Sequence, residues 1–505
     1  MPPERLASLS VALSEQPAGD ALRMFGQWAR WSTSDGSVQD VRARSQPVCY
    51  NTQELKGRGG LAVRIRSVWK VLVISSVFAL VAAACSNDED GGGGTSASGD
   101  TGAVDCSTDE FGCVEVASGE PITIGTLQSI SGDTRNLGLD QQYGVELAAD
   151  YLDGAFDGTN GQIAGHEIDF VHEDDGCSAE GGQAGAQILA ANPQVVAVIG
   201  TSCSSASLGI ADKILAGEKG ILVMSSSATN PALTTAGTHV TGYFRTAHND
   251  RIQAAVVSHF AVEELGAKTA VTIHDESPYT QGLTDGFAAN FEESGGTMNS
   301  DEAINSADKD FKSLLVQIAQ DAPDVIYAPD FNPACALIAK QKATTSGLED
   351  TILLGSDGCS DATYTEIAGD SANGVFLSGP DLTAFSGGDF YSNEFVPAYE
   401  EKVGSAPISV FHAHAFDALN ILAQSIEAVA IDNGDGSLTI PRQALIDEVE
   451  AIDGYKGVIG TLTCTEDGDC ATSVTIGVYE VPDVGFLDPA AKPVFTETLT
   501  LEEVA

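Results

Sequence analysis

From Pro121 onward, short apolar runs alternate with longer segments in which apolar residues recur at helical spacing. Runs of this length are typical of buried strands, and the longer segments are typical of amphipathic helices. The resulting β-α-β-α order predicts a parallel sheet covered by helices on both faces. Strands are predicted over 122–127, 166–172, 194–200 and 220–226, and helices over 137–153, 178–191 and 204–218.

A second series of the same kind follows without a long linker. Two such α/β series indicate two lobes rather than separate domains. Ligands of these sheets bind at the carboxyl ends of the strands, so the cleft between the lobes is the expected site. Strands are predicted over 269–275, 324–329, 351–357 and 374–379, and helices over 251–266, 282–295, 311–320 and 333–347.

The N-terminal region carries an export pattern. Three basic residues between positions 64 and 70 precede a 14-residue apolar run over 71–84. This run is shorter than the about 20 residues of a membrane-spanning helix and has the layout of a secretory signal. The ending over 81–85 resembles a bacterial lipobox, which implies cleavage before Cys85, lipid on its sulfur, and anchoring to the outer face of the cell membrane. The alternative is an ordinary signal peptide whose product is released.

Residues 1–62 do not fit this plan, because the charged part of a signal normally starts the protein. We expect translation to begin near Val63, with 63–85 as the lipoprotein signal peptide; the alternative is a genuine cytoplasmic extension. Residues 86–120 are rich in Gly, Ser, Thr and Asp and are predicted to form a flexible tether with a small cysteine loop.

Charge excludes one class of function. The 505 residues contain 24 Lys and Arg against 72 Asp and Glu, a formal net charge of −48. Such a surface repels phosphate backbones, so the protein is not expected to bind nucleic acid.

Ten cysteines are present. Cys49 lies in the doubtful extension and Cys85 is the predicted lipid site, which leaves an even number in an exported chain and predicts disulfides. A metal site is disfavoured, because the sequence has no CxxC pair and no Cys/His cluster with zinc spacing. Local spacing favours the pairs Cys106–Cys113, Cys177–Cys203, Cys335–Cys359 and Cys464–Cys470.

Several short segments, in this order and spacing, resemble one family. The chain from about 121 to 485 is similar to type I periplasmic (solute) binding proteins of ABC transporters, in the leucine/isoleucine/valine-binding group. The resemblance implies two Rossmann-like lobes with parallel sheets joined by a three-crossover hinge, and a Cys177–Cys203 bridge. The segments are Gly200–Ser205, Met224–Thr234, Ile273–Gly282, Gly355–Gly358, Ile367–Gly369 and Gly460–Thr463.

This resemblance divides the chain into discontinuous lobes. Lobe 1 is expected at 121–245 and 380–460, and lobe 2 at 246–379 and 461–490. Residues 491–505 are left as a C-terminal tail.

Ser202, Cys203 and Ser204 follow the strand 194–200 and open the predicted helix 204–218. Free N–H groups and the positive dipole end of a helix favour a carboxylate. The alternative is a serine that only caps the helix.

The resemblance implies further ligand contacts. Backbone and hydroxyl groups of Ala228 and Thr229 complete the carboxylate and ammonium contacts; without the resemblance this segment is simply a turn. Asp357 in lobe 2 is expected to pair with the α-ammonium, although an Asp in a turn is more often structural. Tyr279 matches a tyrosine that closes over the ligand.

Phe331 and Phe411 match two positions of the family's pocket. Phe331 stands where the family often has tyrosine, and Phe411 matches an apolar pocket residue that core packing explains equally well. The side chain of the ligand therefore stays open, with branched-chain amino acids first.

The expected function is binding without chemistry. A small molecule is captured between the lobes of a monomer and delivered to a membrane permease and its ATPase; no cofactor or metal is expected. His412 and His414 do not share a helix face, the segment 432–437 lacks the carboxylates of an EF-hand, and no nucleophile elbow or P-loop occurs. The alternative is a ligand sensor without a transport role.

Overall fold

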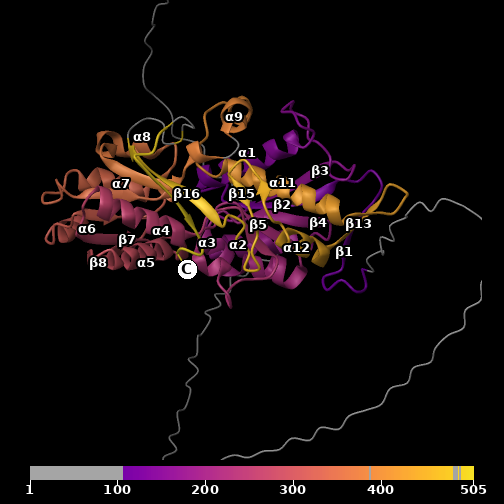
Figure 1. The fold of residues 1–505 in the computed structure, drawn as a ribbon, viewed down its shortest axis with the longest axis horizontal. Helices are drawn as coiled ribbons and strands as arrows, with labels where there is room; N and C mark the ends of the chain where they lie inside the picture. The colour runs from indigo at the N-terminus through magenta and orange to yellow at the C-terminus, as the bar shows by residue number, and fades with distance from the viewer. Residues whose placement is uncertain (1–105, 386–387, 482–486, 488–490, 505) are drawn as a thin grey trace, which may run out of the picture. The chain divides into compact units, whose positions relative to one another are not determined.

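The computed structural model describes residues 106–385, 388–481, 487 and 491–504 (Figure 1). The predicted extension, the signal peptide and the lipid site at Cys85 lie outside these residues. The described part contains two large β-sheets and two small ones.

The first large sheet has five parallel strands in the order β3-β2-β4-β5-β6. All four predicted strands are present, and β6 is an addition of three residues. Successive side chains of a strand point to opposite faces, so the apolar runs feed two core layers. The strands are β2 (Ile122–Gln128), β3 (Ile168–Asp174), β4 (Val195–Gly200), β5 (Leu222–Ser225) and β6 (Tyr243–Arg245).

Helices cover both faces of this sheet, as predicted. In β4, Val196 packs into the core layer formed with α1, α11 and α12, whereas Val198 packs into the layer formed with α2. The helices of this lobe are α1 (Arg135–Tyr151), α2 (Ala179–Ala191), α3 (Ser204–Ala206), α9 (Gly388–Phe390), α10 (Val396–Val403), α11 (His412–Val429) and α12 (Arg442–Glu450).

The second large sheet has the order β17-β16-β11-β10-β9-β7-β8. Its β7 to β11 are parallel, as predicted, whereas β16 is antiparallel to β11 and β17 is antiparallel to β16. Sequence reasoning missed β8, because its polar sequence contains no apolar run. The strands are β7 (Thr269–His274), β8 (Thr297–Ala303), β9 (Val325–Tyr327), β10 (Ile352–Gly355), β11 (Val375–Pro380), β16 (Ser473–Val481) and β17 (Phe495–Thr500).

The helices of the second lobe also form two layers (Figure 1). Side chains of α4 and α5 share one core with Val325 and Leu354, and side chains of α6, α7 and α8 share another with Ile326 and Leu353. The helices are α4 (Asp250–His259), α5 (Pro278–Glu293), α6 (Lys312–Ile318), α7 (Ala334–Lys342) and α8 (Tyr364–Ala368).

The chain passes between the two lobes three times. The connections lie between β6 and α4, between β11 and α9, and between β15 (Thr461–Leu462) and β16. We call these three connections the hinge. The architecture is the two-lobed α/β fold that the sequence predicts.

Both ends of the folded body differ from the prediction. β1 (Cys113–Val116) pairs with β13 (Leu438–Pro441), so the tether does not continue to residue 120. β17 is a strand of the second sheet, so residues 491–505 are not a free tail. Both segments alternate apolar and polar side chains, which suits a half-buried strand. β13 also pairs with β12 (Ile431–Asp432), and residues 433–437 form the turn between them.

The last crossing also lies later than predicted. β15 pairs with β14 (Tyr455–Lys456), and Leu462, Cys464 and Cys470 are buried in the core of lobe 1. Lobe 2 therefore resumes at Ser473, where β16 begins, rather than at residue 461.

The predicted helix 204–218 is broken. After α3, π-helical segments follow at 207–211 and 213–217, with φ of 145° at Ile210. Gly209 lies so close to α2 that a Cβ there would stand 2.6 Å from the Cα of Ala179. The close approach of α2 accompanies this interruption.

The four predicted disulfides are present among the described residues. Two of them flank the loops at the cleft. Cys177–Cys203 joins the loops after β3 and β4, and Cys335–Cys359 joins the start of α7 to the loop after β10. The other two are Cys106–Cys113 and Cys464–Cys470.

Candidate ligand-binding site

Loops at the carboxyl ends of both sheets face one another. Ser204 follows β4 and Thr229 follows β5 in lobe 1, whereas Tyr279 follows β7 and Asp357 follows β10 in lobe 2. The lobes touch here, because the side-chain amide of Asn230 donates to the carbonyl of Pro278 at 2.6 Å. The structure thus brings predicted residues from both lobes to one edge of the cleft.

On the lobe 1 side, Thr229 presents a free hydroxyl. Its side chain is fully buried, and its Oγ1 has no hydrogen-bond partner among the described residues. The backbone N–H of Asn230 donates to Ser204 Oγ at 3.2 Å. The Ser204 hydroxyl can still donate its own proton, so two hydroxyl groups are available to a ligand.

On the lobe 2 side, Tyr279 and Asp357 form a bonded pair. The Tyr279 hydroxyl donates to Asp357 Oδ1 at 2.9 Å and accepts from the N–H of Gly358 at 3.0 Å. Burial, and then the nearby Asp357 carboxylate, raise the pKa of Tyr279 well above its ordinary value. The tyrosine is therefore a permanent donor that orients the carboxylate.

Sequence reasoning missed Asp250, the first residue of α4. It is fully buried, and neither carboxyl oxygen has a hydrogen-bond partner among the described residues. Burial, and then Asp357, raise the pKa of Asp250 well above its ordinary value. Asn249 caps α4 just before it, so an acidic residue here looked like ordinary helix-start chemistry.

The Tyr327 hydroxyl is a third unpartnered group in this region. Burial, followed by Asp250 and Asp357, raises the pKa of Tyr327 well above its ordinary value. Two acidic groups and two tyrosines thus surround the end of the second sheet. This arrangement suits a ligand that places a positively charged group beside the two carboxyls.

Apolar side chains supply another wall. Phe331 packs on Tyr279 with ring centroids 4.9 Å apart, and Phe411 lies against the ring of His248 at 6.1 Å. Leu137 and Phe411 of lobe 1 share one apolar cluster with Phe331 of lobe 2. Apolar contact between the lobes is therefore available beside the polar groups.

Three predicted residues support the loops instead of presenting free groups. Ser202 donates its N–H to Asp175 Oδ2 at 2.7 Å, Cys203 is in a disulfide, and the carbonyl of Ala228 accepts from Arg245 at 3.1 Å. A three-residue α3 also has too few aligned peptides for a macrodipole, so the dipole argument does not apply to Ser204.

A cavity of about 430 Å³ opens at the mouth of the cleft. Residues 131–134 of lobe 1 and 331–334 of lobe 2 line it, together with Asp275. Lys309 and Asp133 span the two lobes beside it, with 3.6 Å between Nζ and Oδ2. The entrance therefore combines this charged pair with apolar side chains such as Phe331.

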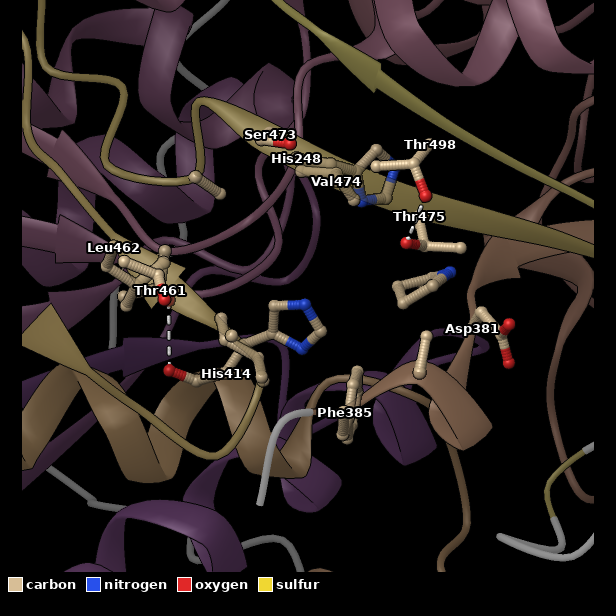
Figure 2. A pocket seen from close by; sticks show the side chains of 16 residues that line it. His248, Asp381, Phe385, His414, Thr461, Leu462, Ser473, Val474, Thr475 and Thr498 are labelled. Atoms are coloured by element: carbon tan, nitrogen blue, oxygen red, sulfur yellow. Dashed lines mark hydrogen bonds between the residues drawn. The ribbon is translucent and has the colours of Figure 1, made fainter. Parts of the chain in front are cut away.

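A second pocket, of about 270 Å³, lies at the hinge, where Figure 2 shows the His414 ring projecting into it. Gln253 donates to Ser378 through its nitrogen, so its oxygen accepts from His248 Nε2 at 2.6 Å. Burial lowers the pKa of both His248 and His414. These two rings therefore favour the neutral form and add no positive charge to this pocket.

His412, unlike His414, makes side-chain hydrogen bonds in the core of lobe 1. Its ring contacts Asp140 at 3.0 Å and Tyr391 at 2.7 Å. Asp140 also accepts the N–H of Phe411 at 3.0 Å, which fixes the start of α11. The described residues include no group of three or more His, Cys, Asp or Glu side chains that could hold a metal ion.

Comparison with known proteins now decides the family. A model of the periplasmic binding protein family matches residues 121–482. The chain belongs to this family. Its members bind solutes, and the family implies a location outside the cytoplasm. Within the described part of this binding protein, no helix is long and apolar enough to cross a bilayer.

Curated relatives of this binding protein carry amino-acid names. It is 27% identical over 308 residues to the leucine-, isoleucine-, valine-, threonine- and alanine-binding protein of Pseudomonas aeruginosa, covering 61% of this chain and 78% of that one. It is also 27% identical over 361 residues to the Leu/Ile/Val-binding protein BraC3 of Rhizobium johnstonii, covering 71% and 91%.

Solved structures agree on the fold. A leucine-binding protein, LivK, of Thermotoga maritima matches with a TM-score of 0.62 at 24% identity, covering 76% of this chain and 99% of that one. LivJ of Streptococcus pneumoniae, solved with isoleucine, matches with a TM-score of 0.61 at 23% identity, covering 75% and 99%. A solute-binding protein of R. palustris, solved with benzoate, matches at 0.60 and 22%, covering 75% and 96%.

Proposed function

We propose that this solute-binding protein captures an α-amino acid in the interlobe cleft and delivers it to the permease of an ABC importer. The observation that carries the proposal is the meeting of two hydroxyls from lobe 1 with two buried acidic groups from lobe 2. An α-amino acid offers the complementary pair, a carboxylate for donors and an ammonium for carboxylates.

The ligand's two charged ends have separate partners in this proposal. The carboxylate accepts from the Ser204 hydroxyl. The ammonium lies between Thr229 Oγ1 and the carboxyls of Asp357 and Asp250. Tyr279 orients Asp357 and closes over the head group. A free buried hydroxyl and an unpartnered carboxyl support this placement, because a ligand would satisfy both.

An aliphatic side chain suits the wall formed by Leu137, Phe331 and Phe411. Burying such a side chain stabilises the complex by about 1.5–3 kcal/mol. The names of the relatives favour leucine, isoleucine and valine. Because a similar fold was solved with benzoate, aromatic acids are further ligands to test, and amides and urea are included in the same screen.

The N-terminal pattern supports tethering at Cys85 on the outer face of the membrane. An anchored receptor stays near its permease, whose ATPase must be another chain because no P-loop occurs. The alternative is a sensor that reports ligand to a regulatory partner. Loss of leucine uptake in cells lacking the protein supports import, whereas normal uptake with an altered transcriptional response supports sensing.

The test is a binding screen with residues 104–505. L-Leucine, L-isoleucine, L-valine and L-alanine are titrated by calorimetry, beside isopentylamine and 4-methylpentanoate, which each lack one charged end. We expect the intact amino acids to bind and to raise Tm, and both truncated analogues to bind far more weakly. Equal binding of 4-methylpentanoate would contradict the role given to the acidic groups.

A further inference from the structure

One buried arginine donates hydrogen bonds through all three nitrogens of its guanidinium group. Arg245 ends β6 at the hinge and has no exposed surface. Its Nε donates to Asp469 Oδ1 at 2.5 Å, and its Nη2 donates to Thr234 Oγ1 at 2.7 Å. Its Nη1 donates to the carbonyls of Ala228 and Asn230 at 3.1 and 3.0 Å.

These two carbonyls flank Thr229. The carbonyl of Thr229 itself accepts from the N–H of Asp250 at 3.0 Å. Three successive carbonyls are therefore held, while the Thr229 hydroxyl stays buried without a partner. The backbone is therefore fixed on both sides of Thr229, whose hydroxyl lies beside the Asp250 carboxyl.

Asp469, the partner of Arg245, is fixed in its turn. It lies in the loop closed by the Cys464–Cys470 disulfide, and this loop bonds to the backbone of Arg245 on both sides. The N–H of Arg245 donates to Gly468 at 3.0 Å, and the N–H of Cys470 donates to Arg245 at 3.1 Å. Asn249 also donates to Asp469 Oδ2 at 3.3 Å. A disulfide loop at the last hinge connection thus holds the guanidinium that holds the Thr229 loop.

We infer that Arg245 is a positioning residue for the ligand's head group, acting through the backbone on either side of Thr229 with Asp469 as its anchor. The inference rests on the proposed function in one respect, namely that Thr229 contacts the head group of the ligand. A planar guanidinium suits the task, since its rigid fork reaches several acceptors in one plane, whereas a lysine ammonium is a point donor on a flexible stem.

The chain offers a matched control. Arg442 is also buried, at 8% exposure, and donates to backbone carbonyls, with 3.0 Å from its Nη2 to Val195 and 3.4 Å to Pro193. These carbonyls lie at the start of β4, away from the cleft loops. Arg245→Lys and Arg442→Lys therefore make the same chemical change in two buried clamps, and only one of these holds Thr229.

The first measurement needs no ligand. Hydrogen exchange of peptides covering residues 226–234 is followed by mass spectrometry in wild type and both variants, at a temperature where all are folded. We expect Arg245→Lys to speed exchange in these peptides at least several-fold and Arg442→Lys to leave them unchanged. Equal exchange in wild type and Arg245→Lys overturns the inference, whatever the protein binds.

The second measurement uses L-leucine as the probe in a double-mutant cycle with Thr229→Val. We expect Arg245→Lys to raise Kd about tenfold or more in the wild-type background and about twofold or less in Thr229→Val, because both changes remove the same contact. Equal losses in both backgrounds overturn the inference. Failure of wild type to bind L-leucine, with a loosened loop in Arg245→Lys, counts against the proposed function and leaves the positioning of the loop supported.

Discussion

The Thr229 loop of lobe 1 and the Asp250 edge of lobe 2 face the same space but are held in opposite ways. Around Thr229, backbone groups are bonded to Arg245, Ser204 and Asp250, and one hydroxyl is left over. Around Asp250, the backbone is ordinary helix start and the carboxyl itself has no partner. Lobe 1 thus supplies fixed backbone geometry, and lobe 2 supplies a buried carboxyl that has no partner among the described residues.

We expect the largest loss of ligand affinity when a lobe 2 carboxylate is removed. Asp357→Ala leaves the ligand's ammonium buried with less counter-charge, which costs about 2–5 kcal/mol of binding free energy. Calorimetry with L-leucine measures the loss. Asp301→Ala is the control, because Asp301 lies on β8 with a half-exposed side chain. Unchanged affinity in Asp357→Ala would remove that residue from the site.

Asp250→Asn should separate binding from stability. An ionised ligand partner is lost, so Kd should rise about tenfold, equivalent to ~1.4 kcal/mol. The same change should stabilise the ligand-free protein. Because the folded-state pKa of Asp250 is raised, folding carries a penalty that grows as pH rises above the unfolded value of about 4, and asparagine escapes it. Thermal melting at pH 5 and pH 8 should show the larger gain in Tm at pH 8.

Asp212→Asn is the matched control for that experiment. Burial raises the pKa of Asp212 to about 7, but this residue lies in the broken helix of lobe 1, beside Ser207. It should gain stability in the same pH direction without any change in Kd. A loss of affinity in Asp212→Asn would show that replacing a buried carboxyl away from the cleft is enough to weaken binding.

A lobe 1 hydroxyl should matter less than the Asp357 carboxylate. Ser204→Ala removes one hydrogen bond to the ligand and one acceptor for the N–H of Asn230, at about 1–2 kcal/mol in total. Calorimetry should show a loss of roughly five- to thirtyfold. If Ser204→Ala proves costlier than Asp357→Ala, the contrast between a geometric lobe and a charged lobe is wrong.

The smallest effect belongs to the entrance. Lys309 and Asp133 form an interlobe pair in which both side chains are more than half exposed, at 59% and 66%. Such pairs contribute about 0–1 kcal/mol and are screened by salt. Lys309→Ala should change Kd less than about fivefold at low ionic strength, and not measurably in 1 M salt.

Much of the fold could be predicted because buried parallel strands are continuous apolar runs. β2, β4 and β10 stand out in the sequence for this reason. β8 and β17 could not be found in this way, since both lie at edges of the second sheet and carry polar side chains. The disulfides were predictable because each pair is also close in sequence.

The candidate site was predictable only in part. Ser204, Thr229, Tyr279 and Asp357 follow from resemblance to the family, and the structure places them at one edge of the cleft. Asp250 was missed, because burial and lack of a partner are properties of the folded chain that a helix-start sequence does not reveal. The role of Arg245 was equally hidden, since its acceptors are backbone carbonyls that carry no sequence signal.

The pairing of β1 with β13 has a mechanical consequence. Val114 and Val116 are buried in the core of lobe 1, so the chain leaves the folded body from this lobe. If Cys85 is anchored in the bilayer as proposed, the tether would join lobe 1, which carries Thr229, and lobe 2 would not be attached to the membrane directly. Closure on a ligand would then move lobe 2 toward the anchored lobe 1.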